Sequence, residues 1–189
     1  MLSAEEPTIT VLGVSGSLRA ASLNTAVVET AAELCTPPMQ MDIYRGIGEL
    51  PFFNSDVELS DPPSSVLEFR SRIEAADAVL FSCPEYAHGM SGVLKNALEW
   101  VVGGGELIGK PTAVVSASTS ITGGDRAQAW LTETLEVMGA QILPERLPIA
   151  SARGKISGGR LTDPETLGQL RDVLAALTQA ARVPAGMGF

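Results

Sequence analysis

Apolar runs of strand length alternate with helical patterns along most of this chain, and this alternation limits the folds open to it. Five runs are typical of strands: 8–14, 40–44, 77–83, 111–117 and 141–149. Five segments have helical patterning: 24–35, 64–76, 91–102, 124–139 and 163–181. Strands that alternate with helices form crossover units, and hence a parallel sheet covered on both faces. We therefore expect an α/β fold.

The chain length of 189 residues favours one domain, because single domains commonly contain roughly 100–200 residues. We assign residues 1–189 to it and expect residues 1–7 and 182–189 to be flexible. No apolar stretch approaches the ~18 residues of a membrane span. The acidic N-terminus has no apolar core of a secretory signal. These features predict a cytoplasmic protein that does not bind membranes.

Charge and cysteine content exclude two further classes of partner. The net charge is −9, with 22 acidic and 13 basic residues, and no basic run stands out, so nucleic acid would be repelled. Cys35 and Cys83 form no Cys-x-x-Cys pair, and His88 is the only histidine, so we predict no metal site. Cys83 lies in an apolar run and is expected to be a buried thiol.

The polar turn after the first predicted strand has the donors of an anion site. The first N–H groups of a helix lack intrahelical partners and point toward whatever lies above them. The turn has no Gly-Lys-Ser/Thr sequence and no Gly-x-Gly-x-x-Gly sequence, so a nucleoside triphosphate loop and a dinucleotide loop are disfavoured. A terminal phosphate monoester fits best. Its side-chain donors are Ser15, Ser17, Arg19, Ser22 and Asn24.

Two other loops follow predicted strands at the same edge of the sheet, where open parallel sheets bind ligands. Pro84 ends the third strand, and Glu85, Tyr86, His88 and Gly89 follow it. This loop can offer backbone groups and a flat wall to a planar heterocycle. A structural role for His88 is favoured over a catalytic one, because no serine nucleophile sequence accompanies it.

The loop at 116–126 follows the fourth predicted strand and contains hydroxyl groups and the pair Gly123-Gly124. It can face the other edge of a flat ligand. Read alone, it is an ordinary loop before a helix.

Together these segments resemble the NADPH-dependent FMN reductase family of flavodoxin-like proteins. The matching segments are 16–19 with Ser22 and Asn24, 84–86, 92–100, 109–111, 123–124 and 138–140, and the resemblance covers about residues 8–149. One departure is Met90-Ser91, where the family often has proline before the glycine. Ser91 can cap the following helix equally well, so we expect the fold to be kept.

The resemblance implies a three-layer, flavodoxin-like fold with a five-stranded parallel sheet in the order 2-1-3-4-5 and helices on both faces. It implies FMN as cofactor, with its phosphate at the first turn and its ring between the other two loops, and a homodimer or homotetramer. No catalytic side chain is assigned, because the flavin would carry the chemistry. The predicted cofactor-binding residues are Ser15, Ser17, Arg19, Ser22, Leu23, Asn24, Pro84, Glu85, Tyr86, Ala87, His88, Gly89, Ser116, Ser118, Gly123 and Gly124.

The favoured function is an enzyme that passes a hydride from NADPH or NADH to FMN and on to an acceptor. Free flavin, a quinone, an azo compound or a metal oxyanion would be suitable, and a flavin-dependent monooxygenase is a conceivable partner. Arg19 can serve the FMN phosphate or the phosphates of NADPH. The alternatives are a flavodoxin-type electron carrier without NAD(P)H turnover and an apo-like regulatory or structural paralogue.

Overall fold

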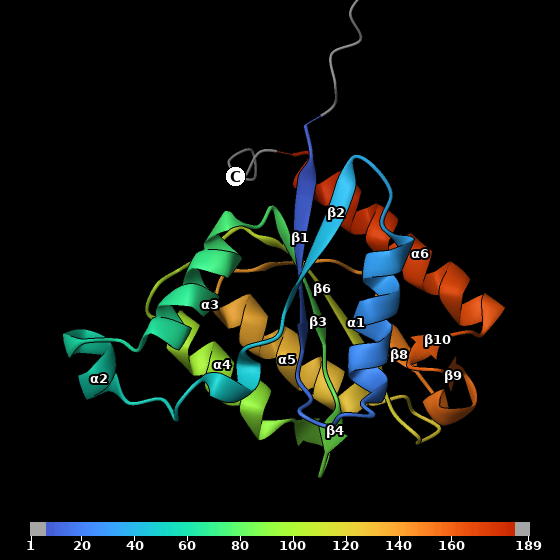
Figure 1. Cartoon of the computed structure of the whole chain (residues 1–189), viewed down its shortest axis with the longest axis horizontal. Coiled ribbons are helices and arrows are strands. Elements are labelled where there is room, and N and C mark those ends of the chain that lie inside the picture. Colours follow the sequence, from blue (N-terminus) through green and yellow to red (C-terminus); the bar gives the residue numbers. More distant parts are fainter. Residues whose placement is uncertain (1–6, 184–189) are drawn as a thin grey trace, which may run out of the picture.

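The computed structural model describes residues 7–183, and its centre is a parallel sheet (Figure 1). Within these residues the sheet has six strands, in the order β2-β1-β3-β6-β7 with β8 also paired to β6. Every pair in it is parallel. The predicted α/β class is confirmed. The strands are β1 (Ile9–Ser15), β2 (Met39–Tyr44), β3 (Ala78–Ser82), β6 (Pro111–Ala117), β7 (Gln141–Ile142) and β8 (Leu147–Ile149).

The prediction of one continuous strand over 141–149 is wrong. β7 pairs with Pro111 and Thr112, whereas β8 pairs with β6 from Val115 onward, and residues 143–146 between them belong to no strand. Pro144 lies in this gap, and proline has no N–H to donate to a neighbouring strand. The sheet therefore has six strands and not five. The two short strands share the fifth position, so the predicted order is otherwise kept.

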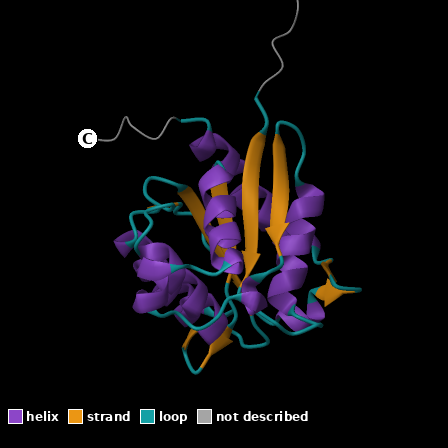
Figure 2. Cartoon of the chain, turned by 60° about the vertical axis from the view of Figure 1, so that its left-hand side comes forward, coloured by secondary structure: helices purple, strands orange, loops and turns teal. Residues whose placement is uncertain are grey.

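Two layers of helices cover the sheet (Figures 1 and 2). The helices α1 (Leu23–Leu34) and α6 (Pro164–Ala181) pack on one face. On the other face lie α3 (Ser64–Ala75), α4 (Gly92–Val102) and α5 (Asp125–Val137). These five helices match the predicted ones to within two residues at each end.

The short elements were not predicted from the sequence, because a segment of a few residues has no periodic pattern. Two of them are antiparallel hairpins outside the main sheet: β4 (Glu85–Tyr86) with β5 (Gly89–Met90), and β9 (Ile156–Ser157) with β10 (Arg160–Leu161). The missed helical segments are η1 (Ile47–Glu49), α2 (Ser55–Ser60) and η2 (Ala152–Gly154).

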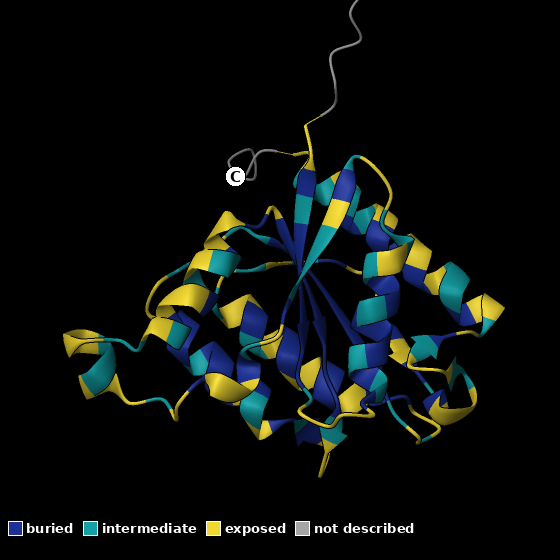
Figure 3. Ribbon diagram, viewed as in Figure 1, coloured by how far each residue is buried: buried dark blue, intermediate teal, exposed yellow. Residues whose placement is uncertain are grey.

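The core consists of two apolar clusters, one on each face of the sheet (Figure 3). Alternate residues of β3 enter opposite clusters: Val79 and Phe81 face α3–α5, and Ala78 and Leu80 face α1 and α6. Cys83, just beyond β3, is fully buried, and burial raises the pKa of its thiol to about 12. The prediction of a buried structural thiol is thus confirmed.

Most of the two termini that we expect to be flexible, residues 1–6 and 184–189, lie outside the described residues. Among the helices that are described, none combines the length and the apolar character needed to cross a bilayer.

Candidate functional site

The carboxyl ends of β1, β3 and β6 bring the three predicted loops together around one cleft of about 110 Å³. Nine of the sixteen predicted residues line it, and Ala117 and Thr119, which were not predicted, line it too. Both flank Ser118 directly after β6, so the end of that strand was the signal that could have found them. The lining residues are Ser17, Arg19, Ser22, Leu23, Asn24, Pro84, Glu85, Tyr86, Ala117, Ser118 and Thr119.

The first turn offers backbone donors to the cleft. The Ser22 hydroxyl caps α1 by accepting from the Thr25 N–H at 3.1 Å, and the Ala26 N–H makes the first helical bond, to the Ser22 carbonyl at 3.0 Å. The N–H groups of Leu23 and Asn24 come before this bond in the same turn, so no helical carbonyl is in position to accept from them. This end of α1 is therefore suited to an anion.

Arg19 adds a cation to this turn. It is exposed, it lines the cleft, and its guanidinium makes no hydrogen bond or ion pair with any residue from 7 to 183. The half-buried Ser17 accepts from the Arg19 N–H at 3.4 Å, which helps to shape the turn. Helix N–H groups beside a free guanidinium form a donor set that matches a phosphate group.

Asn24 lines the cleft but its side chain is committed inward. It is 3% exposed, and its amide donates to the Ala117 carbonyl at 2.9 Å. Its oxygen accepts from the Ala117 N–H at 3.0 Å and from the Ser82 hydroxyl at 2.9 Å. Asn24 therefore joins the start of α1 to the ends of β3 and β6. Its side chain holds the walls of the cleft together and is not directed at a ligand.

Two further predicted residues lie beneath the cleft and not in its wall. The Ser15 hydroxyl shares a hydrogen bond with the Thr25 hydroxyl at 2.9 Å, and the fully buried Ser116 donates to the Gly123 carbonyl at 2.8 Å. Their side chains hold the first and third loops in place.

The second loop is a tight hairpin held against α5. The Glu85 carboxylate accepts from the N–H groups of Arg126 and Ala127, each at 3.1 Å, so it caps the start of α5. At the other strand of the hairpin, a Cβ on the buried Gly89 would lie 3.5 Å from the Trp130 ring. The hairpin is thus fixed at both strands to the same helix.

The tip of this hairpin points away from the cleft. Ala87 and His88 have φ of 49° and 64°, the left-handed region that non-glycine residues rarely occupy. Both are exposed, and neither lines the cleft. His88 lies 3.6 Å from the Glu85 carboxylate. Tyr86, which does line the cleft, is 53% exposed and presents part of its ring to solvent.

The third loop depends on two glycines in the left-handed region. Gly123 has φ of 71°, and a Cβ there would lie 2.7 Å from the Pro148 backbone, so only glycine fits. Gly124 has φ of 90° and stands at the N-terminus of α5. The Ser118 N–H donates to the Ile149 carbonyl at 3.1 Å, which holds the loop on β8. The two glycines lie behind the cleft and do not line it.

Ser91 connects the second loop to the first. Its hydroxyl caps α4 by accepting from the Leu94 N–H at 3.4 Å, and it donates to the Gly16 carbonyl at 2.6 Å. The expectation that Ser91 caps this helix is confirmed. The same hydroxyl also fixes the backbone at the start of the first turn, which follows β1.

The sequence matches the family model described as NADPH-dependent FMN reductase over residues 9–154. It is 40% identical over 174 residues to an NAD(P)H-dependent FMN reductase of Pseudomonas aeruginosa, covering 89% of this chain and 93% of the relative. It is 38% identical over 186 residues to an NAD(P)H:quinone oxidoreductase of Solanum tuberosum, covering 94% of this chain and 95% of the relative.

Among solved structures, the fold is similar to that of FerB, a flavoenzyme NAD(P)H:(acceptor) oxidoreductase of Paracoccus denitrificans. The TM-score is 0.81 at 32% sequence identity, and the superposition covers 93% of this chain and 98% of FerB. Sequence and structure comparisons therefore agree on the same group of flavoproteins.

We predict that Asn24→Ala lowers the free energy of unfolding by about 3 kcal/mol, because it removes three hydrogen bonds and leaves buried groups of Ser82 and Ala117 unpaired. Urea denaturation measures the change. Asn54→Ala is the matched control, since Asn54 caps the exposed α2 through one bond and should contribute about 1 kcal/mol. Equal losses in the two variants would contradict the special role of Asn24.

Proposed function

This chain belongs to the NADPH-dependent FMN reductase family and is an NAD(P)H-dependent oxidoreductase that uses FMN, and we propose how its own residues serve that reaction. The observation that carries the proposal is the cleft at the carboxyl ends of β1, β3 and β6, which has a phosphate-type donor set beside an exposed aromatic side chain. When bound, FMN would supply the hydride-accepting ring, and the protein supplies binding and orientation.

The FMN phosphate would bind at the first turn. The N–H groups of Leu23 and Asn24, the Ser17 hydroxyl and the Arg19 guanidinium are the proposed donors, and Ser22 forms the cap beside them. Ser15 and Asn24 hold this turn through bonds to the protein. The Arg19 guanidinium pairs with no residue from 7 to 183, so its charge is available to the phosphate, and this supports the assignment.

The flavin ring would lie against the second and third loops. Pro84, Glu85 and Tyr86 of the second loop and Ser118 of the third loop line the cleft. We propose that Ala87, His88 and Gly89 shape the hairpin, and that Ser116, Gly123 and Gly124 hold the third loop behind it. No side chain is assigned a catalytic role, and the position of His88 at the exposed tip supports a structural role for it.

The electron acceptor is a small molecule, and we propose that it is a quinone. The relative from Solanum tuberosum is named for quinone as acceptor, which supports this choice over a flavin-dependent monooxygenase partner. We also propose a cytoplasmic location, supported by the two free thiols of Cys35 and Cys83.

We propose a homodimer formed through the ends of α4 and α5. Val102, Ile108 and Val137 are exposed by 62%, 70% and 86%, and together with Met138 they line one largely apolar depression of about 590 Å³. Contiguous exposed apolar surface of this kind is typical of a contact between proteins.

Anaerobic addition of NADPH to the FMN-loaded protein should bleach the oxidised flavin band within seconds, and addition of excess benzoquinone should restore it. Absorbance in a stopped-flow cell measures both steps. Flavin that stays oxidised with both NADPH and NADH would favour the electron-carrier alternative. Bleaching without recovery on quinone would support the reduction of FMN by NADPH and contradict the proposal that quinone is the acceptor.

Arg19→Ala should weaken FMN binding by about tenfold or more, because a charge-assisted contact to phosphate is lost. Titration of flavin fluorescence against the apoprotein measures the affinity. Arg146→Ala removes an exposed arginine that lines none of the clefts described, and its FMN affinity should stay within twofold of the original. If Arg19→Ala behaves like this control, Arg19 does not bind the phosphate.

Val137→Asp should halve the mass of the particle in solution, because it places a charge in the proposed apolar contact. Light scattering after size exclusion measures the mass. Ile121→Asp is the control, since Ile121 is 89% exposed in the loop after β6, whereas Ile108 precedes β6 and so lies toward the opposite end of that strand. A particle that keeps its mass in Val137→Asp would place the interface elsewhere.

A further inference from the structure

A second cleft, of about 600 Å³, adjoins the proposed flavin site and is lined by four arginines. We call it the arginine groove, after Arg19, Arg45, Arg153 and Arg160. Arg19, Ser22, Leu23 and Thr119 line both clefts, so the two are contiguous. A ligand that begins beside the flavin site can therefore extend into the groove without crossing a barrier of protein.

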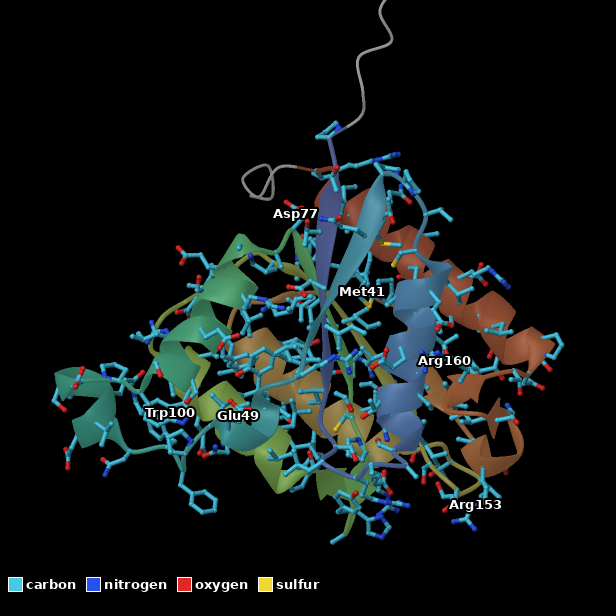
Figure 4. The ribbon with its side chains drawn as sticks, in the orientation of Figure 1. Met41, Glu49, Asp77, Trp100, Arg153 and Arg160 are labelled. Carbon is cyan, nitrogen blue, oxygen red and sulfur yellow. The ribbon has the colours of Figure 1, made fainter. Side chains whose placement is uncertain are left out.

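The groove lies between α1 and the segment that follows β8. Arg45 comes directly after β2, Arg153 lies on η2 and Arg160 lies on β10. Figure 4 shows Arg160 beside α1, and Arg153 nearer the end of the molecule where the β4–β5 hairpin lies. The Leu161 N–H donates to the buried Thr30 hydroxyl of α1 at 2.9 Å, which holds this wall in place.

The positive charge in the groove is only partly neutralised. Glu29 is the one carboxylate among the lining residues; it lies 2.6 Å from Arg45 and 3.9 Å from Arg160. Glu33, outside the groove, pairs with Arg160 at 2.5 Å. Arg19 and Arg153 pair with no residue from 7 to 183. In a chain of net charge −9, this concentration of unpaired cations is an electrostatic site for an anion.

We propose that the arginine groove binds the adenosine half of NADPH, with Arg153 and Arg45 toward its 2′-phosphate. This inference rests on the proposed function, because it requires the nicotinamide end to reach the flavin in the adjoining cleft. A guanidinium binds a phosphate through two parallel hydrogen bonds. Arg153 pairs with no residue from 7 to 183 and is free to make this contact, whereas Arg45 would share its guanidinium between the phosphate and Glu29. NADH lacks the 2′-phosphate, so the groove would favour NADPH.

A substitution of Glu29 separates the proposal from simple damage to the fold, because the two predict opposite changes in the affinity for a phosphate. Its carboxylate would repel an incoming phosphate, and it forms ion pairs with Arg45 and Arg160. Removing this charge should therefore tighten the binding of a phosphate, whereas removing Arg153 should weaken it. A nonspecific structural loss would weaken binding in both variants.

The test is calorimetric titration of the FMN-loaded protein with adenosine 2′,5′-bisphosphate, 5′-AMP and inorganic phosphate. We expect the bisphosphate to bind about tenfold more tightly than 5′-AMP, Arg153→Gln to weaken it about tenfold, and Glu29→Gln to tighten it severalfold. Arg171→Gln is the control, because Arg171 lines a different cleft, beside residues 34–39, and its affinity should not change.

The proposal is overturned if Arg153→Gln binds the bisphosphate as well as the control does, or if inorganic phosphate binds as tightly as the bisphosphate. Anaerobic flavin reduction separates these failures from failure of the proposed function. If NADH reduces the flavin in both Arg153→Gln and the original protein, and the KM for NADPH is unchanged, the groove proposal is wrong and the reductase activity stands. If neither nucleotide reduces the flavin of the original protein, the proposed function itself is wrong.

Discussion

The buried amide of Asn24 is the interaction on which the site depends. Its three hydrogen bonds join the start of α1 to Ser82 at the end of β3 and to both backbone groups of Ala117 at the end of β6. A parallel sheet leaves backbone groups unpaired where its strands end, and burial makes such groups costly. A single side chain satisfies several of them here, and in doing so it joins the end of the first loop to the starting points of the other two.

The loops themselves are held by contacts that leave little freedom near the cleft. Ser91 fixes the backbone of Gly16, Glu85 caps α5, and the close approach of Gly123 to Pro148 fixes the third loop. Each contact joins a loop to an element that a different part of the chain supplies. A site of this kind is arranged before its ligand arrives, which reduces the entropy lost on binding.

Charge is distributed unevenly around this rigid frame. The chain is acidic overall, yet the turn after β1 and the segment 153–160 bring arginines to one groove. Arg19 stands where the proposed flavin cleft and the arginine groove meet. The sequence left open whether Arg19 serves the FMN phosphate or the phosphates of NADPH, and under our two proposals it lies at the junction of both sites.

The sequence by itself determined the α/β class, the cap at Ser91 and the three loops at one edge of the sheet, and its resemblance to the family implied the order of the parallel strands. Apolar periodicity and capping are local properties, so they can be read from neighbouring residues. The tertiary structure alone decided that Asn24, Ser15 and Ser116 turn inward, that the fifth strand is broken, and that Arg153 and Arg160 lie beside Arg19 and Arg45. Those outcomes depend on partners far apart in the chain, and only folding brings such partners within the reach of a hydrogen bond or a charge.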